Sequence, residues 1–355
     1  MALKDLKTDF DIIVVGSGIA GCSLAWQWHL NGKSVLLVGD GKKGSSSVAA
    51  GVYNPTILKR FTSVWKAGEQ LDYLNSFYPL IEEKVASKFL HPIEILRRLH
   101  DEREVKTWQK KSQRPELKPF MSHDIFPYDN AAIEAPFNYG KVSGTGWVDT
   151  IGYMKLSRKY FLYQNNFLEE EFDYNELVHS KDSVKYKIYH ASKIIFSEGF
   201  KMTANPFFSD LPLQGNKGEV LTVKIPGLQL DYIIKSSVFL MPYIDDLFWV
   251  GATYNRDELS DMPTDEAKTF LISRLERFLK LPYEIVDHKH GIRPTTKDRR
   301  PFVGAHKDFP NYMVFNGMGS RAVLMAPWAA KQLFDSLYNN QPLNEEININ
   351  RFNNN

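Results

Sequence analysis

The spacing of apolar residues predicts a strand, a turn, a helix and a second strand at the start of the chain. An apolar run at residues 12–15 precedes a glycine-rich turn. The segment after the turn places Leu24, Ala25 and Trp28 on one face, as an amphipathic helix would. A second apolar run spans residues 35–38. This order of elements is typical of the first half of a nucleotide-binding α/β fold.

Further along the chain, helical and extended patterns alternate. Residues 218–224, 232–241 and 247–254 alternate like antiparallel strands, and Asp245-Asp246 is expected to form a turn. The middle of the chain therefore predicts a sheet with helices, distinct from the opening unit. The other predicted strands are 93–99, 176–179, 184–189, 193–197 and 312–315, and the predicted helices are 63–81, 101–111, 149–164, 264–280 and 317–338.

The turn after the first strand has glycines at the spacing of a dinucleotide fingerprint. Gly16 permits a tight turn, Gly18 lets the backbone approach a pyrophosphate, and Gly21 lets the helix pack closely on the strand. The free N–H groups of the first helical turn would face an anion. We therefore predict a dinucleotide site here, and the fingerprint alone suits NAD as well as FAD.

Two other loops carry candidate chemistry. Residues 41–55 contain small residues, hydroxyls and two lysines, which would bring N–H and hydroxyl groups against phosphate and a flat ring. Residues 317–321 form a second glycine turn that opens the last helix. A second helix N-terminus is therefore expected to face a ligand.

Composition narrows the class of protein. With 355 residues, 43% hydrophobic and 24% charged, the chain is long enough for two domains and ordinary for a soluble globular protein. No run approaches the roughly 18 apolar residues of a membrane span, so a cytoplasmic protein without a membrane span is expected. Cys22 is the single cysteine, which excludes an internal disulfide. The net charge of +2 argues against nucleic acid as the default partner and leaves room for a local basic patch.

Two polar clusters receive a structural interpretation. His288 and His290 would share one face of a strand, but no cysteine or obvious third ligand accompanies them, so we predict no metal site. The most basic region is interpreted as a solvated face and comprises Arg97, Arg98, Arg103, Lys106, Lys110 and Lys111.

Several ordered motifs resemble the flavin-dependent D-amino acid oxidase superfamily, which includes glycine oxidase and sarcosine oxidase. They are the opening fingerprint, the serine-rich loop ending at residues 49–51, Glu198-Gly199, and residues 248–253, 291–294, 317–321 and 326–327. Within the superfamily, residues 297–304 and 319–321 with 326–327 are most similar to the oxidase half of bifunctional tRNA-modifying enzymes, which act on carboxymethylaminomethyl-uridine at the wobble position.

The resemblance implies an α/β fold with a Rossmann-like FAD-binding domain and an α+β substrate domain with a mixed or antiparallel sheet. The expected FAD-binding domain is discontinuous and comprises residues 1–80, 140–212 and 288–355. Residues 81–139 and 213–287 form the expected substrate-binding domain.

The same resemblance assigns FAD as the cofactor. Gly317 to Val323 would bring the last helix N-terminus to the pyrimidine side of the flavin, and the backbone at Val178 would meet the adenine. We predict that FAD is noncovalent, since neither the serine-rich loop nor the C-terminal region offers the His or Cys that some members use for attachment. The implied cofactor-binding residues are Gly16, Ser17, Gly18, Ile19, Ala20, Gly21, Gly39, Asp40, Ser46, Ser47, Ala50, Gly51, Val178, Glu198, Gly199, Gly317, Met318, Gly319, Ser320, Arg321, Ala322 and Val323.

One position departs from the family pattern. The acidic residue that ends the second strand and binds the adenosine ribose aligns with Gly39, and the nearest carboxylate is Asp40. Successive side chains of a strand face opposite sides, so Asp40 would serve only if the chain has already turned.

The chemistry implied by the resemblance is hydride transfer to the flavin from the carbon next to an amine nitrogen. Arg293 is the expected clamp for a substrate carboxylate, because the matching arginine of glycine oxidase binds that group. The alternative for Arg293 is a structural ion pair. Arg321, Tyr243 and Tyr53 are further candidates for the substrate pocket, and the tyrosines are also explained by packing.

Three functions remain open from the sequence. The leading one is FAD-dependent oxidation of a small-molecule amine or amino acid, preferably an N-substituted glycine. The second is oxidative removal of a carboxymethyl group from a wobble uridine, with tRNA as partner. The third is a flavin-binding protein without catalysis. The sequence does not indicate the oligomeric state.

Overall fold

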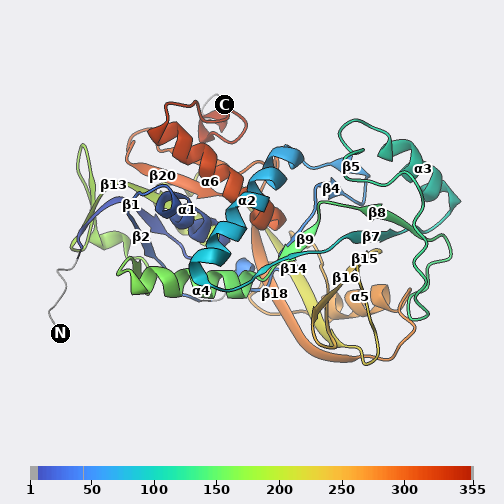
Figure 1. The fold of residues 1–355 in the computed structure, drawn as a ribbon. Coiled ribbons are helices and arrows are strands. Elements are labelled where there is room, and N and C mark those ends of the chain that lie inside the picture. The colour runs from blue at the N-terminus through green and yellow to red at the C-terminus, as the bar shows by residue number, and fades with distance from the viewer. Residues whose placement is uncertain (1–6, 43, 353–355) are drawn as a thin grey trace.

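The computed structural model describes residues 7–42 and 44–352, which form two units side by side, each built on its own sheet (Figure 1). The first sheet has eight strands in the order β10-β2-β1-β13-β12-β11, with β20 also paired to β13 and β19 to β20. Its core strands β2, β1, β13 and β20 are parallel, which confirms the predicted α/β fold. The strands are β1 (Asp9–Val15), β2 (Val35–Val38), β10 (Phe167–Leu168), β11 (Leu177–His179), β12 (Val184–Tyr186), β13 (Tyr189–Phe196), β19 (Phe302–Ala305) and β20 (Tyr312–Asn316).

Helices cover one face of this sheet in a single apolar core. Trp28, Leu74, Phe161 and Leu333 come from four different helices and share that core. The opposite face of the sheet packs in a second cluster, which includes Phe208. Burial on both faces explains why β1 and β2 read as continuous apolar runs. The helices are α1 (Ile19–Leu30), α2 (Ala67–Val85), α4 (Thr150–Tyr163) and α6 (Ala322–Tyr338).

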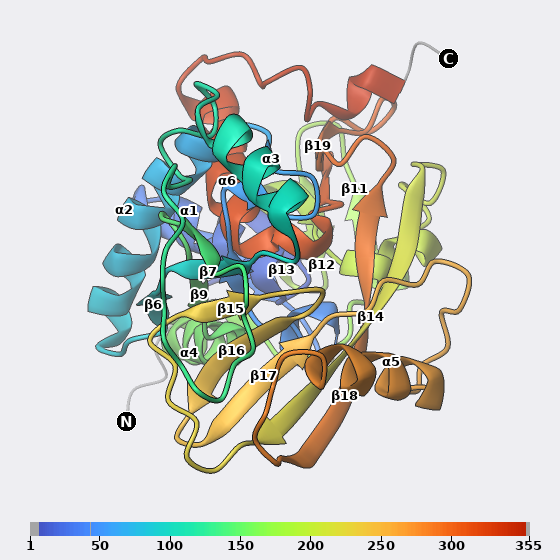
Figure 2. The same ribbon diagram turned by 90° about the vertical axis from the view of Figure 1, so that its right-hand side faces the viewer.

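The second sheet has seven strands in the order β18-β14-β17-β16-β15-β7-β8. Figure 2 looks onto this unit, with α3 (Glu102–Ser112) near the top and α5 (Asp265–Leu275) near the bottom. Asp101 caps α3 by accepting a hydrogen bond from the Glu104 amide (2.7 Å), as the helix start predicted. The strands are β7 (Ile95–Arg98), β8 (Tyr139–Val142), β14 (Leu213–Lys224), β15 (Ile233–Lys235), β16 (Phe239–Ile244), β17 (Leu247–Gly251) and β18 (Glu284–Thr296).

Short strands connect the two units. They form two small sheets, β3-β9-β6 and β4-β5, and β3 follows the serine-rich loop directly in the chain. Five short 3-10 helices complete the described secondary structure. These elements are β3 (Val52–Tyr53), β4 (Thr56–Ile57), β5 (Thr62–Ser63), β6 (Leu90–Pro92), β9 (Gly146–Val148), η1 (Ser45–Ser47), η2 (Tyr174–Glu176), η3 (Gly199–Ala204), η4 (Gly319–Arg321) and η5 (Ile349–Phe352).

Some element predictions need correction. The strand predicted over 232–241 is two strands, β15 and β16, because a turn closed by the Ser236 amide and the Val238 carbonyl (3.0 Å) interrupts it. The helix predicted to end at residue 280 ends at Leu275. The long strand β18 was not predicted as a single element, and it keeps residues 288–296 in the second sheet rather than in the first unit.

No helix among the described residues combines the length and apolar character that crossing a membrane requires.

Candidate functional site

The glycine turn between β1 and α1 is packed as close backbone approach requires. Gly16 has φ of 102°, and a Cβ on Gly21 would lie 1.7 Å from the Gly16 carbonyl oxygen. Gly18 is the N-cap of α1, no side chain caps the helix there, and its first turn contains no acidic residue. The amide of Ile19 donates to the Ser46 hydroxyl (3.3 Å). The N-terminus of α1 therefore presents backbone N–H groups without a competing anion.

The serine-rich loop joins this turn to the second sheet. A Cβ on Gly18 would lie 3.2 Å from Ser46 Oγ, and a Cβ on Gly291 of β18 would lie 2.9 Å from Ser45 Cα. Ser47 bonds within the loop, accepting from the Gly44 amide (3.2 Å) and donating to the Gly44 carbonyl (2.8 Å). Of the two predicted serines, Ser46 thus contacts the start of α1, whereas Ser47 forms hydrogen bonds within the loop.

The second glycine turn packs against the end of β18. Gly317 and Gly319 have φ of 78° and 57°, and a Cβ on Gly317 would lie 2.7 Å from Thr296 Cγ2. The first turn of α6 contains no acidic residue, and no side chain caps it. The last part of β18 therefore packs against the turn that opens α6 and against the serine-rich loop, which in turn contacts the start of α1. The predicted residues Met318, Ser320, Arg321, Ala322 and Val323 lie in this turn and at the start of α6.

The end of β2 has no acidic side chain at position 39, where the family pattern has the residue that binds the adenosine ribose. A Cβ on Gly39 would lie 2.4 Å from Ser17 Oγ and 2.9 Å from the Ser17 amide nitrogen, so no side chain fits at position 39. The Asp40 carboxylate accepts from the Lys42 amide (3.0 Å) and from Lys201 Nζ (3.1 Å). Ser17 therefore occupies the space that an acidic side chain would need, and Asp40 is engaged with two lysines.

The structure does not bring Val178 to this end of the sheet. Val178 pairs with Lys185, which pairs with His190, which pairs with Asp9 at the start of β1. Six residues at about 3.3 Å each separate that row from Val15 and the glycine turn, or roughly 20 Å. The side chain of Val178 is also 57% exposed. The predicted adenine contact at Val178 therefore lacks structural support.

Glu198 lies directly after β13 and is largely enclosed. Its carboxylate accepts from the Tyr174 hydroxyl (2.5 Å) and from Asn205 Nδ2 (2.7 Å). Burial raises its pKa, and the two donors oppose that rise. Gly199 follows with φ of 62°, and its carbonyl accepts from Asn316 Nδ2 (2.8 Å). Glu198-Gly199 thus ties β13 to the strand that leads into the second glycine turn.

The Arg293 side chain extends from β18 over Gly218 of the neighbouring strand β14. A Cβ on Gly218 would lie 1.9 Å from Arg293 Nη2, so only glycine admits the guanidinium there. Arg293 Nη1 donates to the Thr253 carbonyl (3.2 Å) and is 3.4 Å from Asn216 Oδ1. The Tyr254 ring stacks on the guanidinium, with 4.5 Å from its centroid to Cζ. Burial lowers the pKa of Arg293, and the nearby Tyr254 opposes this.

Arg321 stands at the start of α6, in a turn that packs on β18: a Cβ on Gly319 would lie 3.6 Å from Thr295 Cγ2. Its Nη1 donates to the Asn54 carbonyl (3.2 Å). Burial lowers its pKa, while Tyr254 acts in the opposite direction. Tyr254 thus influences the pKa of both arginines. Within residues 7–42 and 44–352, no carboxylate forms an ion pair with either, so the structural ion pair considered for Arg293 is not observed.

The two candidate tyrosines have different environments. Tyr243 is half-buried on β16, and its ring is 5.5 Å from that of Trp147, beside the partly buried Ala50. Tyr53 is only 3% exposed, packs in the core of the first unit, and has a pKa raised to about 12 by burial. Tyr53 is therefore a packing residue in this structure, because its ring has no free face.

Sequence reasoning missed four residues that lie next to Arg293 or Arg321: Asn54, Asn216, Gly218 and Tyr254. All four act on Arg293 or Arg321 through strand pairing or loop contacts between distant segments. Tyr254 directly follows the 248–253 motif, which was the one available signal for it.

Comparison with protein families decides the class. The model of the family DAO, described as FAD dependent oxidoreductase, matches residues 11–336. The chain belongs to this family.

The relatives of this FAD-dependent oxidoreductase fall into two groups. Glycine oxidase of Pseudomonas aeruginosa is 22% identical over 353 residues, covering 94% of this chain and 96% of the relative. The tRNA 5-methylaminomethyl-2-thiouridine biosynthesis bifunctional protein MnmC of Campylobacter concisus is 23% identical over 311 residues. That match covers 83% of this chain and 47% of the relative, so the chain spans about half the length of MnmC.

Solved structures share the fold. The glycine oxidase of Geobacillus kaustophilus has a TM-score of 0.75 at 16% identity, with 95% of this chain and 96% of that chain covered. The iminodiacetate oxidase IdaA of Chelativorans sp. BNC1 has a TM-score of 0.77 at 16% identity, with 94% and 98% covered.

The residues of this oxidoreductase fit its FAD cofactor. Two helix N-termini without side-chain caps or first-turn acids suit the anionic parts of a dinucleotide. The steric need for glycine at position 21 and the positive φ at position 16 fit a pyrophosphate held by backbone groups. The ribose contact stays a prediction, with Ser17 and Asp40 as the groups at hand.

Each histidine of the pair lies close to a carboxylate group. His288 Nε2 is 2.9 Å from Glu219 Oε2, and His290 Nε2 is 3.1 Å from Asp261 Oδ1. Among the described residues, no group of three or more His, Cys, Asp or Glu side chains is arranged to hold a metal.

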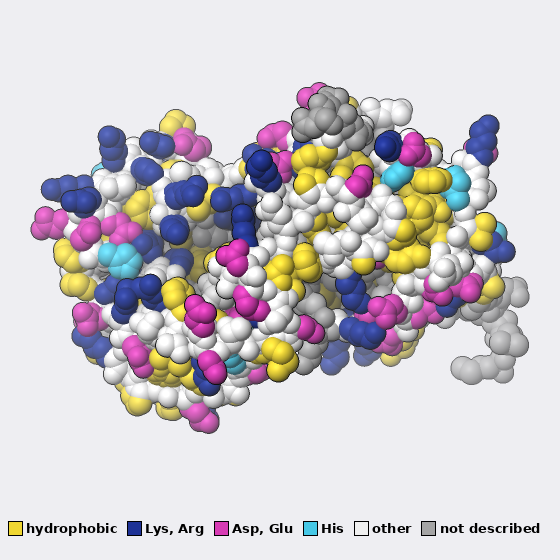
Figure 3. Space-filling view, turned by 180° about the vertical axis from the view of Figure 1, so that it is seen from behind, with side chains coloured by type: hydrophobic (Ala, Val, Ile, Leu, Met, Phe, Trp, Pro, Cys, Tyr) yellow, Lys and Arg dark blue, Asp and Glu magenta, His cyan; other side chains and the backbone are white. Residues whose placement is uncertain are grey.

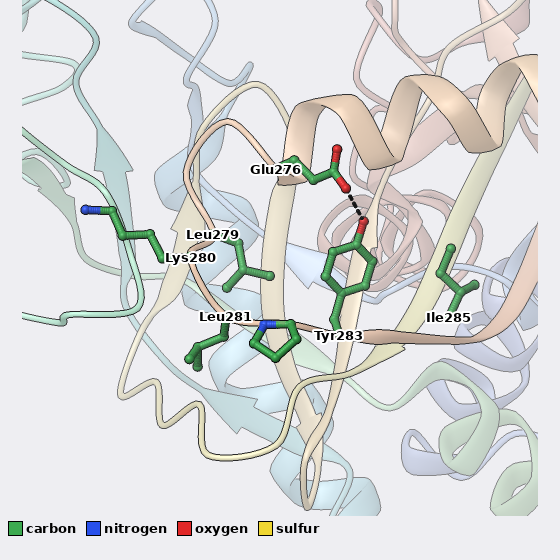
Figure 4. Close-up of a pocket in the computed structure, with 7 residues that line it drawn as sticks. Glu276, Leu279, Lys280, Leu281, Tyr283 and Ile285 are labelled. Atoms are coloured by element: carbon green, nitrogen blue, oxygen red, sulfur yellow. Dashed lines mark hydrogen bonds between the residues drawn. The ribbon is translucent and has the colours of Figure 1, made fainter.

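A separate hollow of about 750 Å³ follows α5, where the Tyr283 hydroxyl donates to Glu276 (3.0 Å; Figure 4). Ile285, which lines it, precedes Arg293 by eight residues on β18, or roughly 27 Å along a strand. This hollow is therefore distinct from the space around Arg293.

Proposed function

We propose that this FAD-dependent oxidoreductase oxidises a secondary amine that carries a carboxylate, with an N-substituted glycine as the preferred class. The observation that carries the proposal is that Arg293 lies on β18, Arg321 lies in the turn that packs on the end of β18, and neither has a carboxylate partner among the described residues. A charged group that is partly buried without a partner is destabilising. A substrate carboxylate would supply the missing partner.

Each arginine has a distinct role in this proposal. Arg293 is held through Nη1 by the Thr253 carbonyl and flanked by Tyr254, so its orientation is fixed before a ligand arrives. A planar guanidinium held in this way suits a carboxylate better than lysine would. Arg321, held by Asn54, adds a second positive charge at the start of α6.

FAD, when bound, supplies the two-electron oxidation by accepting a hydride from the carbon next to the amine nitrogen. The protein orients that carbon by fixing the carboxylate at the arginines. The C=N product then takes up water and separates into a carbonyl compound and the shorter amine.

The test is reduction of the flavin without oxygen by matched pairs of amines. N-Methylglycine and iminodiacetate should bleach the flavin absorbance, whereas N-methylethanolamine, which lacks the carboxylate, should do so at least about tenfold more slowly at equal concentration. Equal rates for both members of a pair would contradict the carboxylate clamp. Bleaching by no amine would favour a flavin-binding protein without catalysis.

A second candidate uses the same chemistry on carboxymethylaminomethyl-uridine in tRNA. Its support is the similarity to MnmC proteins over 83% of the chain and the same two arginines, since that nucleoside carries an N-substituted glycine. Incubation with tRNA containing the nucleoside, followed by nucleoside mass spectrometry, should reveal loss of the carboxymethyl group. Full activity on free amines and none on such tRNA would decide against this candidate.

A further inference from the structure

The outer face of α3 forms a basic groove of about 1020 Å³. Five cationic side chains line it, against two acidic ones at its helix-start end. We name it the α3 groove; its lining residues are Asp101, Glu102, Arg103, Lys106, Thr107, Lys110, Lys111, Arg114 and Phe137. Seen from behind, lysine and arginine side chains gather over the half of the molecule that carries α3 (Figure 3). Within the described chain, none of the five cations has an ion-pair partner.

Helix stability alone does not account for this charge. Lys110 and Lys111 lie in the last turn, where the helix dipole favours cations. Glu102 favours Lys106 at four-residue spacing, but Arg103 lies in the first turn, where the dipole disfavours a cation, and Lys106 and Lys110 repel each other at the same spacing. Arg103, Lys106 and Lys110 are all exposed, so no buried contact explains them.

The β4–β5 hairpin joins the α3 groove to the surroundings of Arg293 and Arg321, which we call the arginine site. Lys111 Nζ donates to the Arg60 carbonyl (2.5 Å), at the tip between β4 and β5. Asn54, which accepts from Arg321, lies six residues before Arg60. Six extended residues span at most about 22 Å. Lys59 and Arg60 are exposed on this tip and continue the positive charge from α3 toward the site.

From this placement we propose that the α3 groove, with Lys59 and Arg60, binds the phosphate backbone of the RNA whose modified nucleotide enters the arginine site. The inference rests on the tRNA candidate above and adds the surface that would hold the RNA. Lysine and arginine side chains at several points along a backbone provide the charge neutralisation that governs RNA affinity. Phe137 adds a half-buried aromatic ring to the groove, which suits stacking on an unpaired base.

RNA fits these features better than other anionic partners. The cations of the α3 groove alternate with Thr107 and Phe137, which offer a hydroxyl and an aromatic ring to a nucleotide. The cations on α3, from Arg103 to Lys111, extend for roughly 12 Å, given about 1.5 Å of rise per residue, which is enough to meet more than one phosphate.

The test measures binding of a fluorescein-labelled RNA stem-loop to the FAD-loaded protein by anisotropy at several salt concentrations. The variant Arg103→Glu/Lys106→Glu places acids early in α3, where the dipole favours them, so the helix should remain folded. We expect its affinity to fall at least about tenfold and the slope of log K against log salt to decrease by about 1.4 to 1.8, for two lost phosphate contacts. Flavin reduction by N-methylglycine should be unchanged.

The matched control is Lys181→Glu/Lys185→Glu, which reverses two exposed lysines on the β11–β12 hairpin at the other end of the molecule. This variant should lose less than about twofold in RNA affinity. Equal RNA binding by the α3 variant, or binding of the wild type to phosphatidylserine vesicles but not to RNA, would overturn the inference. RNA binding that depends on α3, without flavin reduction by N-methylglycine or iminodiacetate, would uphold this surface and count against the free-amine proposal; flavin reduction by these amines without RNA binding would do the reverse.

Discussion

At the residue scale, the position of the Arg293 guanidinium depends on the absence of a side chain at Gly218 on the neighbouring strand. Arg293 was predictable, because it stands in the Gly-Ile-Arg-Pro motif. The space for it was not, because Gly218 is 75 residues earlier in the chain and meets Arg293 only through the pairing of β14 with β18. For Tyr53, the burial in the structure favours the packing alternative, which the sequence left open because a lone tyrosine carries no sign of its burial.

Gly218→Ala tests this dependence. The added methyl group would overlap Arg293 Nη2 and displace the guanidinium, so kcat/KM for N-methylglycine should fall by about tenfold to a hundredfold with FAD content retained. Gly68→Ala is the control, because nothing lies within 4 Å of its Cβ position at the start of α2. Steady-state kinetics of the two variants should separate them, and equal kcat/KM in both would remove the steric argument.

At the element scale, features set by neighbouring residues could be predicted from the sequence, whereas features set by pairing between distant segments could not. Asp101 and Asp149 were correctly placed at the starts of α3 and α4, because capping depends on neighbouring residues alone. The adenine contact at Val178 lacks structural support, since the position of a short strand in a sheet depends on pairing that the sequence does not reveal. The turn that divides β15 from β16 was missed because apolar residues stand on both sides of Ser236.

Gly21→Ala tests the cofactor role assigned to the first glycine turn. Its Cβ would lie 1.7 Å from the Gly16 carbonyl oxygen, so α1 must move away from β1 and its N-terminus from the pyrophosphate. We expect the purified variant to lose most of its flavin absorbance at visible wavelengths. Gly44→Ala, with nothing within 4 Å of its Cβ position, should keep the flavin content of the wild type. A Gly21→Ala protein that retains full flavin would refute the role.

At the scale of the whole molecule, β18 connects the two units. It pairs with β14 along the second sheet, packs Gly291 on the serine-rich loop and ends with Thr296 against Gly317. Arg293 lies between these two contacts, which places the clamp between the serine-rich loop and the second glycine turn. The α/β class followed from the ordered motifs, whereas the path of β18 did not, because its Gly, His and Pro residues break the expected alternation of a strand.

The most direct measurement of the central claim is the rate of anaerobic flavin reduction against N-methylglycine concentration, by stopped flow, for the wild type and Arg293→Ala. Arg256→Ala, an exposed arginine two residues after Tyr254, is the control. Loss of charged hydrogen bonds of about 1.5 to 3 kcal/mol should raise the apparent Kd of Arg293→Ala by roughly tenfold or more. Its flavin content should remain that of the wild type, and Arg256→Ala should be unchanged. An unaltered Kd in Arg293→Ala would contradict the account.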